Sequence, residues 1–201
     1  MRFVLATANP DKANEIIAVL ADSGLDIELE ARDPSIPETV ESGSTLEENA
    51  RQKAIDVVTW TGQPAIADDT GLQVDALDGA PGVRSARFAG ERATYDDNVR
   101  LLLERLADVD DARRTARFST VAIARWPDGK EVAALGTVEG RIAREPRGSH
   151  GFGYDPVFVP GDGDGRTFAE MSDAEKHARS HRGRAFRTLA DGLRAVQARE
   201  P

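Results

Sequence analysis

Residues 2–20 read RFVLATANPDKANEIIAVL, and this stretch decides the fold class. Its first six residues form a short apolar run that predicts a buried strand. Asn9 and Pro10 then signal a helix start, because asparagine caps exposed backbone N–H groups and proline fits the first helical position. Apolar residues at positions 13, 16, 17 and 20 follow with helical spacing, and Gly24 ends the pattern. The stretch therefore predicts a strand that leads directly into a helix.

The rest of the chain continues this alternation of strands and helices. The expected strands cover 27–31, 65–68, 72–76, 115–125 and 131–143, and the expected helices cover 44–60, 94–107 and 172–197. We expect a turn at Gly71 between two of these strands and a break near Gly183 in the last helix. The helix over 44–60 begins with two capping-box spacings, Ser44 to Glu47 and Thr45 to Glu48. Strands interleaved with helices, followed by a late hairpin, predict an α/β fold with a mixed sheet.

The composition is that of an ordinary globular domain. The chain has 201 residues, 35 acidic and 26 basic side chains, and a net charge of -9. This length supports a single domain over residues 1–201, which buries roughly 70% of the surface of its unfolded chain. The absence of cysteine excludes disulfides and thiol catalysis and suits a cytoplasmic protein. No apolar run approaches the roughly 20 residues of a membrane span, and the N-terminus shows no signal peptide. We therefore expect no membrane association.

The acidity also argues against broad nucleic-acid binding, but it leaves room for a small anion in a local basic pocket. Residues 7–12, TANPDK, lie where the first strand opens into the helix, so backbone N–H groups and the positive end of the helix dipole face outward. Thr7 and Asn9 can bind phosphate oxygens there, and Lys12 adds positive charge. The alternative is an ordinary capped helix.

A second candidate segment surrounds the start of the helix over 44–60. Glu41 precedes this helix on a loop that contains glycine. Asn49 and Lys53 are four residues apart, so both project from one helical face. Lys12 and Lys53 can then approach one anion from two helices. The alternative is a solvated helix whose acidic residues serve only as caps.

Two adjacent aspartates, Asp68 and Asp69, end an apolar strand in the sequence Ala65-Ile-Ala-Asp-Asp-Thr-Gly. Strand alternation sends them to opposite faces unless the strand has already ended. A carboxylate pair at a strand end suits a hard divalent cation such as Mg²⁺, with phosphate oxygens as further ligands. The alternative is a polar turn between two strands.

Two later segments are candidates for recognition of a planar base. In GSHGFGYDP, residues 148–156, glycines alternate with Phe152 and Tyr154. An aromatic ring between glycines can stack on a base, or both rings can belong to the core. Residues 176–184, KHARSHRGR, form the densest basic cluster in the chain. They can bind a base edge or phosphates, or they can form a solvated helix face.

In their order along the chain, these segments resemble the inosine/xanthosine triphosphate pyrophosphatase family. The resemblance rests on TANPDK, ESGSTLEENARQKA, ADDTGLQVDALDGAPGVRSARFAG, GSHGFGYDPVF and MSDAEKHARSHRGRA and covers residues 3–193. It implies Mg²⁺-dependent hydrolysis of deaminated purine nucleoside triphosphates (ITP, dITP, XTP) to the nucleoside monophosphate and pyrophosphate. It also implies a homodimer and an elongated fold, with a central mixed sheet flanked by helices and two lobes around an active-site cleft.

The resemblance also implies roles for individual residues. Asp69 is implied as the catalytic carboxylate and a metal ligand, and Glu41 and Asp68 are implied to support the metal. The residues implied to bind the triphosphate are Thr7, Ala8, Asn9, Pro10, Asp11 and Lys12. Those implied to complete the substrate site are Lys53, Thr70, Phe152, Gly153, Tyr154, Asp155, Lys176, His181 and Arg182.

Two positions depart from the family pattern. Thr70 stands where serine is usual, which keeps the hydroxyl, and Arg84 stands where an aromatic residue is common. Two other functions remain open. A pyrophosphatase for modified pyrimidine triphosphates would share the phosphate machinery but need another base pocket. A nucleotide-binding regulator without turnover would not need the carboxylate that activates water.

Overall fold

The computed structural model describes residues 1–199, and these residues form five α-helices and a seven-stranded sheet. The strand order is β2-β1-β3-β5-β6-β7, with β4 paired to β3. Strand β1 runs parallel to β2 and β3, whereas β4 and β7 pair antiparallel with β3 and β6. The predicted α/β class with a mixed sheet is confirmed. The elements are β1 (Arg2–Leu5), α1 (Pro10–Asp22), β2 (Glu28–Glu30), α2 (Leu46–Thr61), β3 (Ala65–Val74), β4 (Pro81–Gly82), α3 (Tyr95–Arg105), β5 (Thr115–Arg125), β6 (Glu131–Ile142), β7 (Phe158–Pro160), α4 (Asp173–Arg179) and α5 (His181–Gln197).

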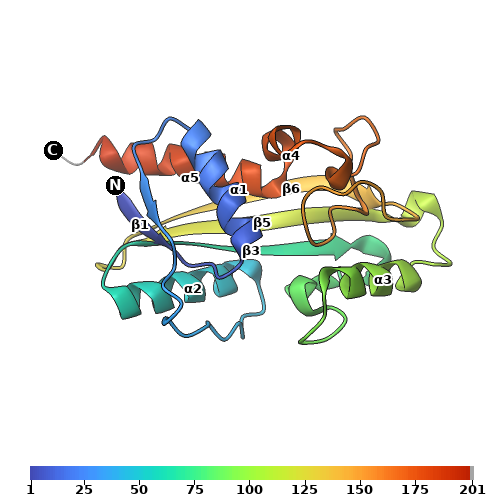
Figure 1. Ribbon diagram of the computed structural model, residues 1–201, viewed down its shortest axis with the longest axis horizontal. Helices are drawn as coiled ribbons and strands as arrows, with labels where there is room; N and C mark the ends of the chain where they lie inside the picture. Colours follow the sequence, from blue (N-terminus) through green and yellow to red (C-terminus); the bar gives the residue numbers. More distant parts are fainter. Residues whose placement is uncertain (200–201) are drawn as a thin grey trace. The chain divides into compact units, whose positions relative to one another are not determined.

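The chain divides into two compact units. The first contains Met1–Asp69, Thr120–Gly136 and, of the described residues, 182–199. In this unit α1 and α5 lie on one face of the strands and α2 lies on the other (Figure 1). Successive side chains of β1 alternate between these faces: Phe3 and Leu5 pack with α1 and α5, whereas Val4 packs with α2. The period of two expected for a strand thus builds two apolar layers.

The helix starts of this unit follow the predicted capping. The side chain of Asn9 accepts hydrogen bonds from the backbone N–H groups of Asp11 and Lys12. Thr45 and Glu48 form a capping box at the start of α2. The other predicted spacing, Ser44 to Glu47, is not a capping box. The Ser44 hydroxyl donates to Glu48 instead, and Glu47 pairs with Arg51 one turn along the helix.

The second unit contains Thr70–Ser119 and Thr137–His181. Its core gathers Leu102 of α3 with Phe118, Phe158 and Phe168. Helix α3 begins with a cap at Thr94, whose hydroxyl accepts from the backbone N–H of Asp97. Both units therefore have apolar cores of their own.

Two predicted breaks are wrong. Gly71 makes no turn, because β3 continues through it from Ala65 to Val74; glycine adopts extended backbone freely, and pairing with neighbouring strands overrides its turn preference. The last helical region breaks at Ser180, whose backbone is extended between α4 and α5, and not at Gly183. A helix tolerates one glycine at a cost of about 1 kcal/mol relative to alanine.

Other expectations about the fold stay predictions. These are the single domain over 1–201, the elongated shape, and the two lobes around a cleft. Within residues 1–199, every helix is too short or too polar to cross a membrane.

Candidate active site

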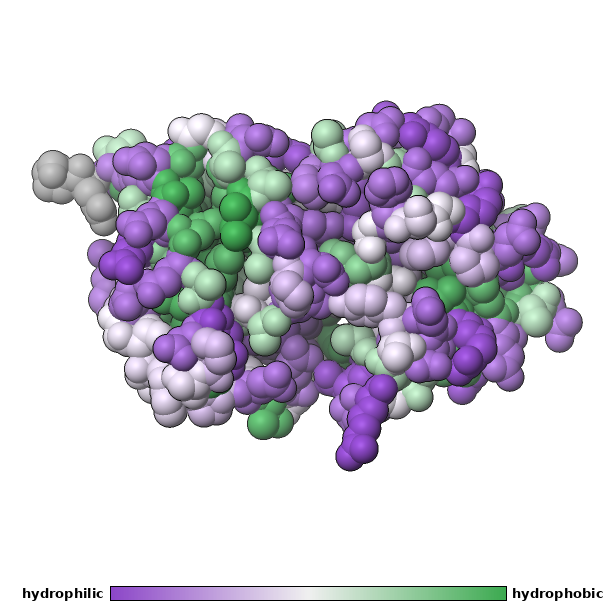
Figure 2. All heavy atoms as spheres, viewed as in Figure 1, coloured by the Kyte–Doolittle hydropathy of each residue, from purple (hydrophilic) through white to green (hydrophobic). Residues whose placement is uncertain are grey.

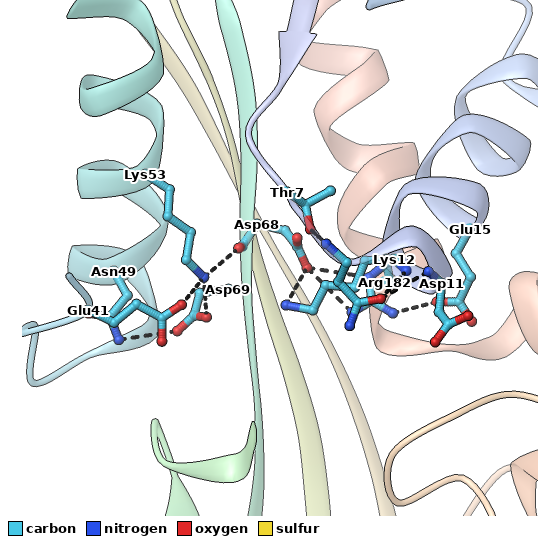
Figure 3. Close-up of polar contacts among 11 residues, drawn as sticks. Thr7, Asp11, Lys12, Glu15, Glu41, Asn49, Lys53, Asp68, Asp69 and Arg182 are labelled. Atoms are coloured by element: carbon cyan, nitrogen blue, oxygen red, sulfur yellow. Dashed lines mark hydrogen bonds and ion pairs between the residues drawn. The ribbon is translucent and has the colours of Figure 1, made fainter. Parts of the chain in front are cut away.

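Strand β3 carries Asp68 and Asp69 in its middle, so the expectation that they end a strand is wrong. The predicted alternation is confirmed, because the two carboxylates point to opposite sides of β3 (Figure 3). Their exposed fractions are only 2% and 5%. Buried carboxylates are costly unless cations or hydrogen-bond donors compensate them. Each aspartate meets a separate set of such partners, both within the first unit.

On the α2 side of β3, one ammonium group holds two carboxylates. Lys53 Nζ lies 2.8 Å from Asp69 Oδ1 and 2.6 Å from Glu41 Oε1. It also donates to the backbone carbonyl of Asp68 at 3.2 Å. Asn49, one turn before Lys53 on α2, donates from Nδ2 to Asp69 Oδ2 at 3.3 Å. The predicted shared face of Asn49 and Lys53 is confirmed, and the face is not simply solvated.

These neighbours shift the proton affinities of the group. Burial raises the pKa of Asp69 above its usual value, although the Lys53 and Lys12 ammonium groups oppose this. Burial by itself lowers the pKa of Lys53, but the Asp69 and Glu41 carboxylates outweigh it and leave this pKa raised. Lys53 therefore stays charged, and Asp69 is a stronger base than an ordinary aspartate.

On the opposite side of β3, Asp68 faces two cations. Its Oδ2 lies 3.7 Å from Lys12 Nζ and 3.4 Å from both Nε and Nη2 of Arg182. Arg182 Nη1 in turn donates to Glu15 of α1. Sequence reasoning missed Glu15, although a signal was present, because it lies three residues after Lys12 and so shares its helix face.

The loop over residues 7–12 is a capped helix start. Asn9 Oδ1 accepts from the N–H groups of Asp11 and Lys12, and Thr7 Oγ1 accepts from the N–H of Asn9. The local geometry confirms the capping alternative, while phosphate binding by this loop stays a prediction.

A hollow of about 730 Å³ adjoins this loop, within the first unit. Apolar side chains of α1 and of the segment over 31–38 line much of it, and hydrophobic atoms gather beside α1 on the face shown in Figure 2. Lys12, Asp68 and Asp69 are not among its lining residues. The hollow is therefore distinct from both ionic groups on β3.

In the second unit, Asp155, Lys176 and Phe152 form a compact polar group. Lys176 Nζ lies 2.6 Å from Asp155 Oδ2, and the same oxygen accepts from the backbone N–H of Phe152 at 2.8 Å. Lys176 Nζ also lies 4.8 Å from the centroid of the Phe152 ring. Gly151 has φ +71°, and a Cβ there would lie 2.2 Å from Asp155 Oδ2. The loop can adopt this arrangement only with glycine at that position.

The remaining predicted base-site residues take different positions. The ring of Tyr154 is buried, and its hydroxyl donates to the backbone carbonyl of Ser85 at 2.9 Å. The ring of His181 stacks on Phe118 with centroids 4.4 Å apart. Phe152 is half-buried and lies 5.8 Å from the ring of Tyr95. Tyr154 therefore belongs to the core, as one alternative proposed, whereas Phe152 is only half-buried.

The predicted basic cluster over residues 176–184 is not a solvated helix face at the positions assigned to the substrate site. Lys176, His181 and Arg182 are each at most 3% exposed, whereas His177 and Arg179 are not buried. Arg84, the departure from the family pattern, is exposed and reaches Glu91 at 4.0 Å. Lys176 and Arg182 are buried cations, and buried cations need compensating partners, so these two positions have specific contacts in the structure.

The donor chemistry of the Asp69 group fits a hard cation. Glu41 and Asp69 place two carboxylates on one cationic nitrogen, and carboxylate oxygens are the ligands Mg²⁺ prefers. Asp68 does not join them, since its carboxylate points to the other side of β3. Across residues 1–199, no three carboxylate or imidazole side chains are placed to bind one metal ion. The three-residue metal set of Glu41, Asp68 and Asp69 stays a prediction.

Comparison with known proteins gives consistent similarities over nearly the whole chain. A model of the Ham1 family matches residues 3–192. A Streptomyces avermitilis protein named dITP/XTP pyrophosphatase is 47% identical, over 97% of this chain and 98% of that protein. The solved structure of a HAM1 protein from Coxiella burnetii superposes with TM-score 0.87 and 41% identity, over 97% and 99% of the two chains. A nucleoside-triphosphatase / dITP/XTP pyrophosphatase structure from Mycobacterium abscessus gives TM-score 0.75 and 45% identity, over 94% and 97%. These similarities confirm the resemblance found in the sequence.

The buried Lys176–Asp155 pair should be strongly coupled. Lys176→Met leaves the Asp155 carboxylate buried without its cation, so we expect it to lower the free energy of unfolding by about 3–5 kcal/mol. Adding Asp155→Asn removes the stranded charge and should recover part of that loss. Chemical denaturation of the wild type, of Lys176→Met, of Asp155→Asn and of the double variant measures this coupling. Glu139→Gln, in an exposed pair with Arg117, is the control and should cost less than about 1 kcal/mol. If the loss of unfolding free energy in the double variant equalled the sum of the losses in the two single variants, the coupling would be contradicted.

Proposed function

We propose that this chain, which belongs to the Ham1 family, hydrolyses deaminated purine nucleoside triphosphates such as dITP and XTP to the nucleoside monophosphate and pyrophosphate. The substrate class is supported by the dITP/XTP pyrophosphatase names of its relatives. The observation that carries the proposal is the buried Asp69 carboxylate, held between Lys53 and Asn49 in one group with Glu41. Such a group has the parts needed to activate water beside a bound anion.

Asp69 acts in this proposal as the general base. Its carboxylate accepts a proton from the water that attacks the α-phosphorus, and pyrophosphate leaves with the electrons of the broken P–O bond. The raised pKa of Asp69, caused mainly by burial, supports this role. A base whose pKa lies closer to neutral pH accepts a proton more readily.

Mg²⁺ fits the donor set of Glu41 and Asp69. When bound there, it would supply a Lewis acid that neutralises negative charge on the phosphate oxygens. Lys53 holds both of these carboxylates close together. The resemblance implies that Asp68 also supports the metal, but its carboxylate points away from Glu41 and Asp69. Its contacts support another role, in which it anchors Lys12 and Arg182.

The cations of the first unit would bind the triphosphate. Lys12 and Lys53 approach β3 from two helices and from opposite sides. Residues 7–12 lie at the N-terminal end of α1, where the helix dipole favours an anion. Positive charge in these places stabilises the negative charge that develops on departing pyrophosphate. Thr70, the next residue after Asp69, adds a hydroxyl.

Residues of the second unit would recognise the base. Hypoxanthine and xanthine present an acceptor at O6 and a donor at N1–H, whereas adenine reverses both. Lys176 and the N–H groups of residues 152–155 can donate to O6, and Phe152 can stack on the ring. His181 completes this set, and the resemblance adds Arg182 from the first unit. Adenine has no acceptor at position 6, so these donors would lose their partner when adenine binds, and the loss of hydrogen bonds disfavours adenine.

We further propose a homodimer, carried over from the resemblance, and a cytoplasmic location. The lack of cysteine suits the reducing conditions of that compartment.

A substrate panel tests the proposed specificity. We expect the wild type with Mg²⁺ to release pyrophosphate from dITP, ITP and XTP with a kcat/KM about 10⁴-fold above that for ATP, because adenine leaves the O6 donors unpaired. Initial rates on these four substrates and on modified pyrimidine triphosphates provide the measurement. Equal efficiency with ATP would contradict the specificity, and preference for a pyrimidine substrate would favour the related pyrimidine-directed activity.

Asp69→Asn tests the proposed base. The substitution keeps the shape of the side chain but removes its charge and basicity, so turnover should fall by at least about 10²-fold. Steady-state kinetics with dITP measure the loss, and circular dichroism verifies that the variant is folded. Near-normal turnover in a folded Asp69→Asn protein would remove Asp69 from this role.

A further inference from the structure

Asn49 is a polar side chain at a position where helices usually bury apolar ones. It lies in α2 between Glu48 and Ala50 and is fully buried. A buried amide is costly unless its oxygen and nitrogen both find partners. The proposed roles of Asp69 as base, of Glu41 and Asp69 as metal ligands, and of the substrate-binding residues do not explain an amide at position 49.

Both ends of this amide have partners in the candidate site. Oδ1 accepts from the backbone N–H of Gly43 at 2.8 Å, and Nδ2 donates to Asp69 Oδ2 at 3.3 Å. Only the oxygen can accept from an N–H group, and only the nitrogen can donate to a carboxylate. The two partners therefore determine the orientation of the amide.

The contact with Gly43 depends on the absence of a side chain at that position. A Cβ on residue 43 would lie 2.6 Å from Asn49 Oδ1 and 2.7 Å from the Cβ of Glu48. Glycine lets the backbone approach the start of α2 closely enough to donate to Asn49. Since Gly43 lies two residues after Glu41, this contact also ties down the loop that carries Glu41.

The contacts close a ring around the proposed base. Lys53 Nζ bonds Asp69 Oδ1 and Glu41, while Asn49 bonds Asp69 Oδ2 and the glycine loop that leads back to Glu41. The two oxygens of Asp69 are thus held by different residues. The terminal torsion of an aspartate is otherwise broad, so two separate donors fix the rotation of this carboxylate.

We infer that Asn49 is a positioning residue, whose amide fixes the Asp69 carboxylate and the Glu41 loop in one arrangement for the attack of water. The inference rests on the proposed function, because it acts through the base assigned there. It assigns Asn49 no contact with the substrate. Loss of the amide should therefore impair the chemical step more than substrate binding.

Asn49→Asp tests this directly. The new side chain keeps an oxygen for the Gly43 N–H but places a second oxygen against Asp69 Oδ2, which repels it. We expect kcat with dITP to fall by about 10- to 100-fold, the usual cost of losing a supporting hydrogen bond behind a reactive group. KM should stay within about threefold of the wild type.

Asn98 of α3 offers a matched control. It is 2% exposed, accepts from the backbone N–H of Ala89 at 2.8 Å and donates to the backbone carbonyl of Ala86 at 3.1 Å. Asn98→Asp therefore makes the same change in an equally buried amide that does not contact Asp69. Its Tm should fall through loss of a buried hydrogen bond, while kcat stays within about threefold of the wild type.

Crystal structures of both variants give a readout that does not depend on activity. We expect the Asp69 carboxylate to rotate away from residue 49 in Asn49→Asp and to keep its place in Asn98→Asp. If Asn49→Asp does not fold, Asn49→Ala is measured in the same way. A variant at residue 49 that lowers only Tm and leaves kcat and the Asp69 rotamer unchanged overturns the inference. If the wild type hydrolyses neither dITP nor XTP, the proposed function fails, and the Asp69 rotamer alone decides the role of Asn49.

Discussion

The contact of one ammonium group with two carboxylates is the interaction on which the candidate site depends. Glu41 and Asp69 come from a loop and from a central strand, and Lys53 Nζ holds both within 2.8 Å. Without a cation between them, two carboxylates this close repel and one of them takes up a proton. Lys53 therefore opposes the rise in the pKa of Asp69 that burial causes. The same pair of carboxylates suits a divalent cation, which links the observed contact to the proposed chemistry.

Helix α2 must lie close to β3 for this contact to exist. Small side chains permit that approach, since Ala50 and Ala54 of α2 pack with Ala65 and Ala67 of β3. Arg51 adds a polar attachment, because its guanidinium pairs with Glu131 at the start of β6 at 2.8 Å. The capping box at Thr45 fixes where α2 begins and hence which face carries Lys53. The alanine packing, the capping box at Thr45 and the contacts of Lys53 thus all favour the same position of α2 against β3.

Local signals in the sequence predicted much of this arrangement. The caps at Asn9 and Thr45 and the shared face of Asn49 and Lys53 follow from helix chemistry, and the opposite directions of Asp68 and Asp69 follow from strand alternation. The error at Gly71 arose because strand pairing within β3 overrides its local turn preference. Helical spacing places Glu15 on the same face as Lys12, but its contact with Arg182 joins residues far apart in the chain, and no local pattern identifies Arg182 as its partner. The core position of Tyr154 likewise depends on a distant acceptor, the carbonyl of Ser85.

Hydrolysis in water enriched in oxygen-18 tests the central claim most directly. The proposed role of Asp69 places the attacking water on the α-phosphorus. The account therefore predicts that the label enters the nucleoside monophosphate and that pyrophosphate carries none. Mass spectrometry of the products after a single turnover gives the answer. Label in pyrophosphate or in orthophosphate would mean attack at another phosphorus and would contradict the account.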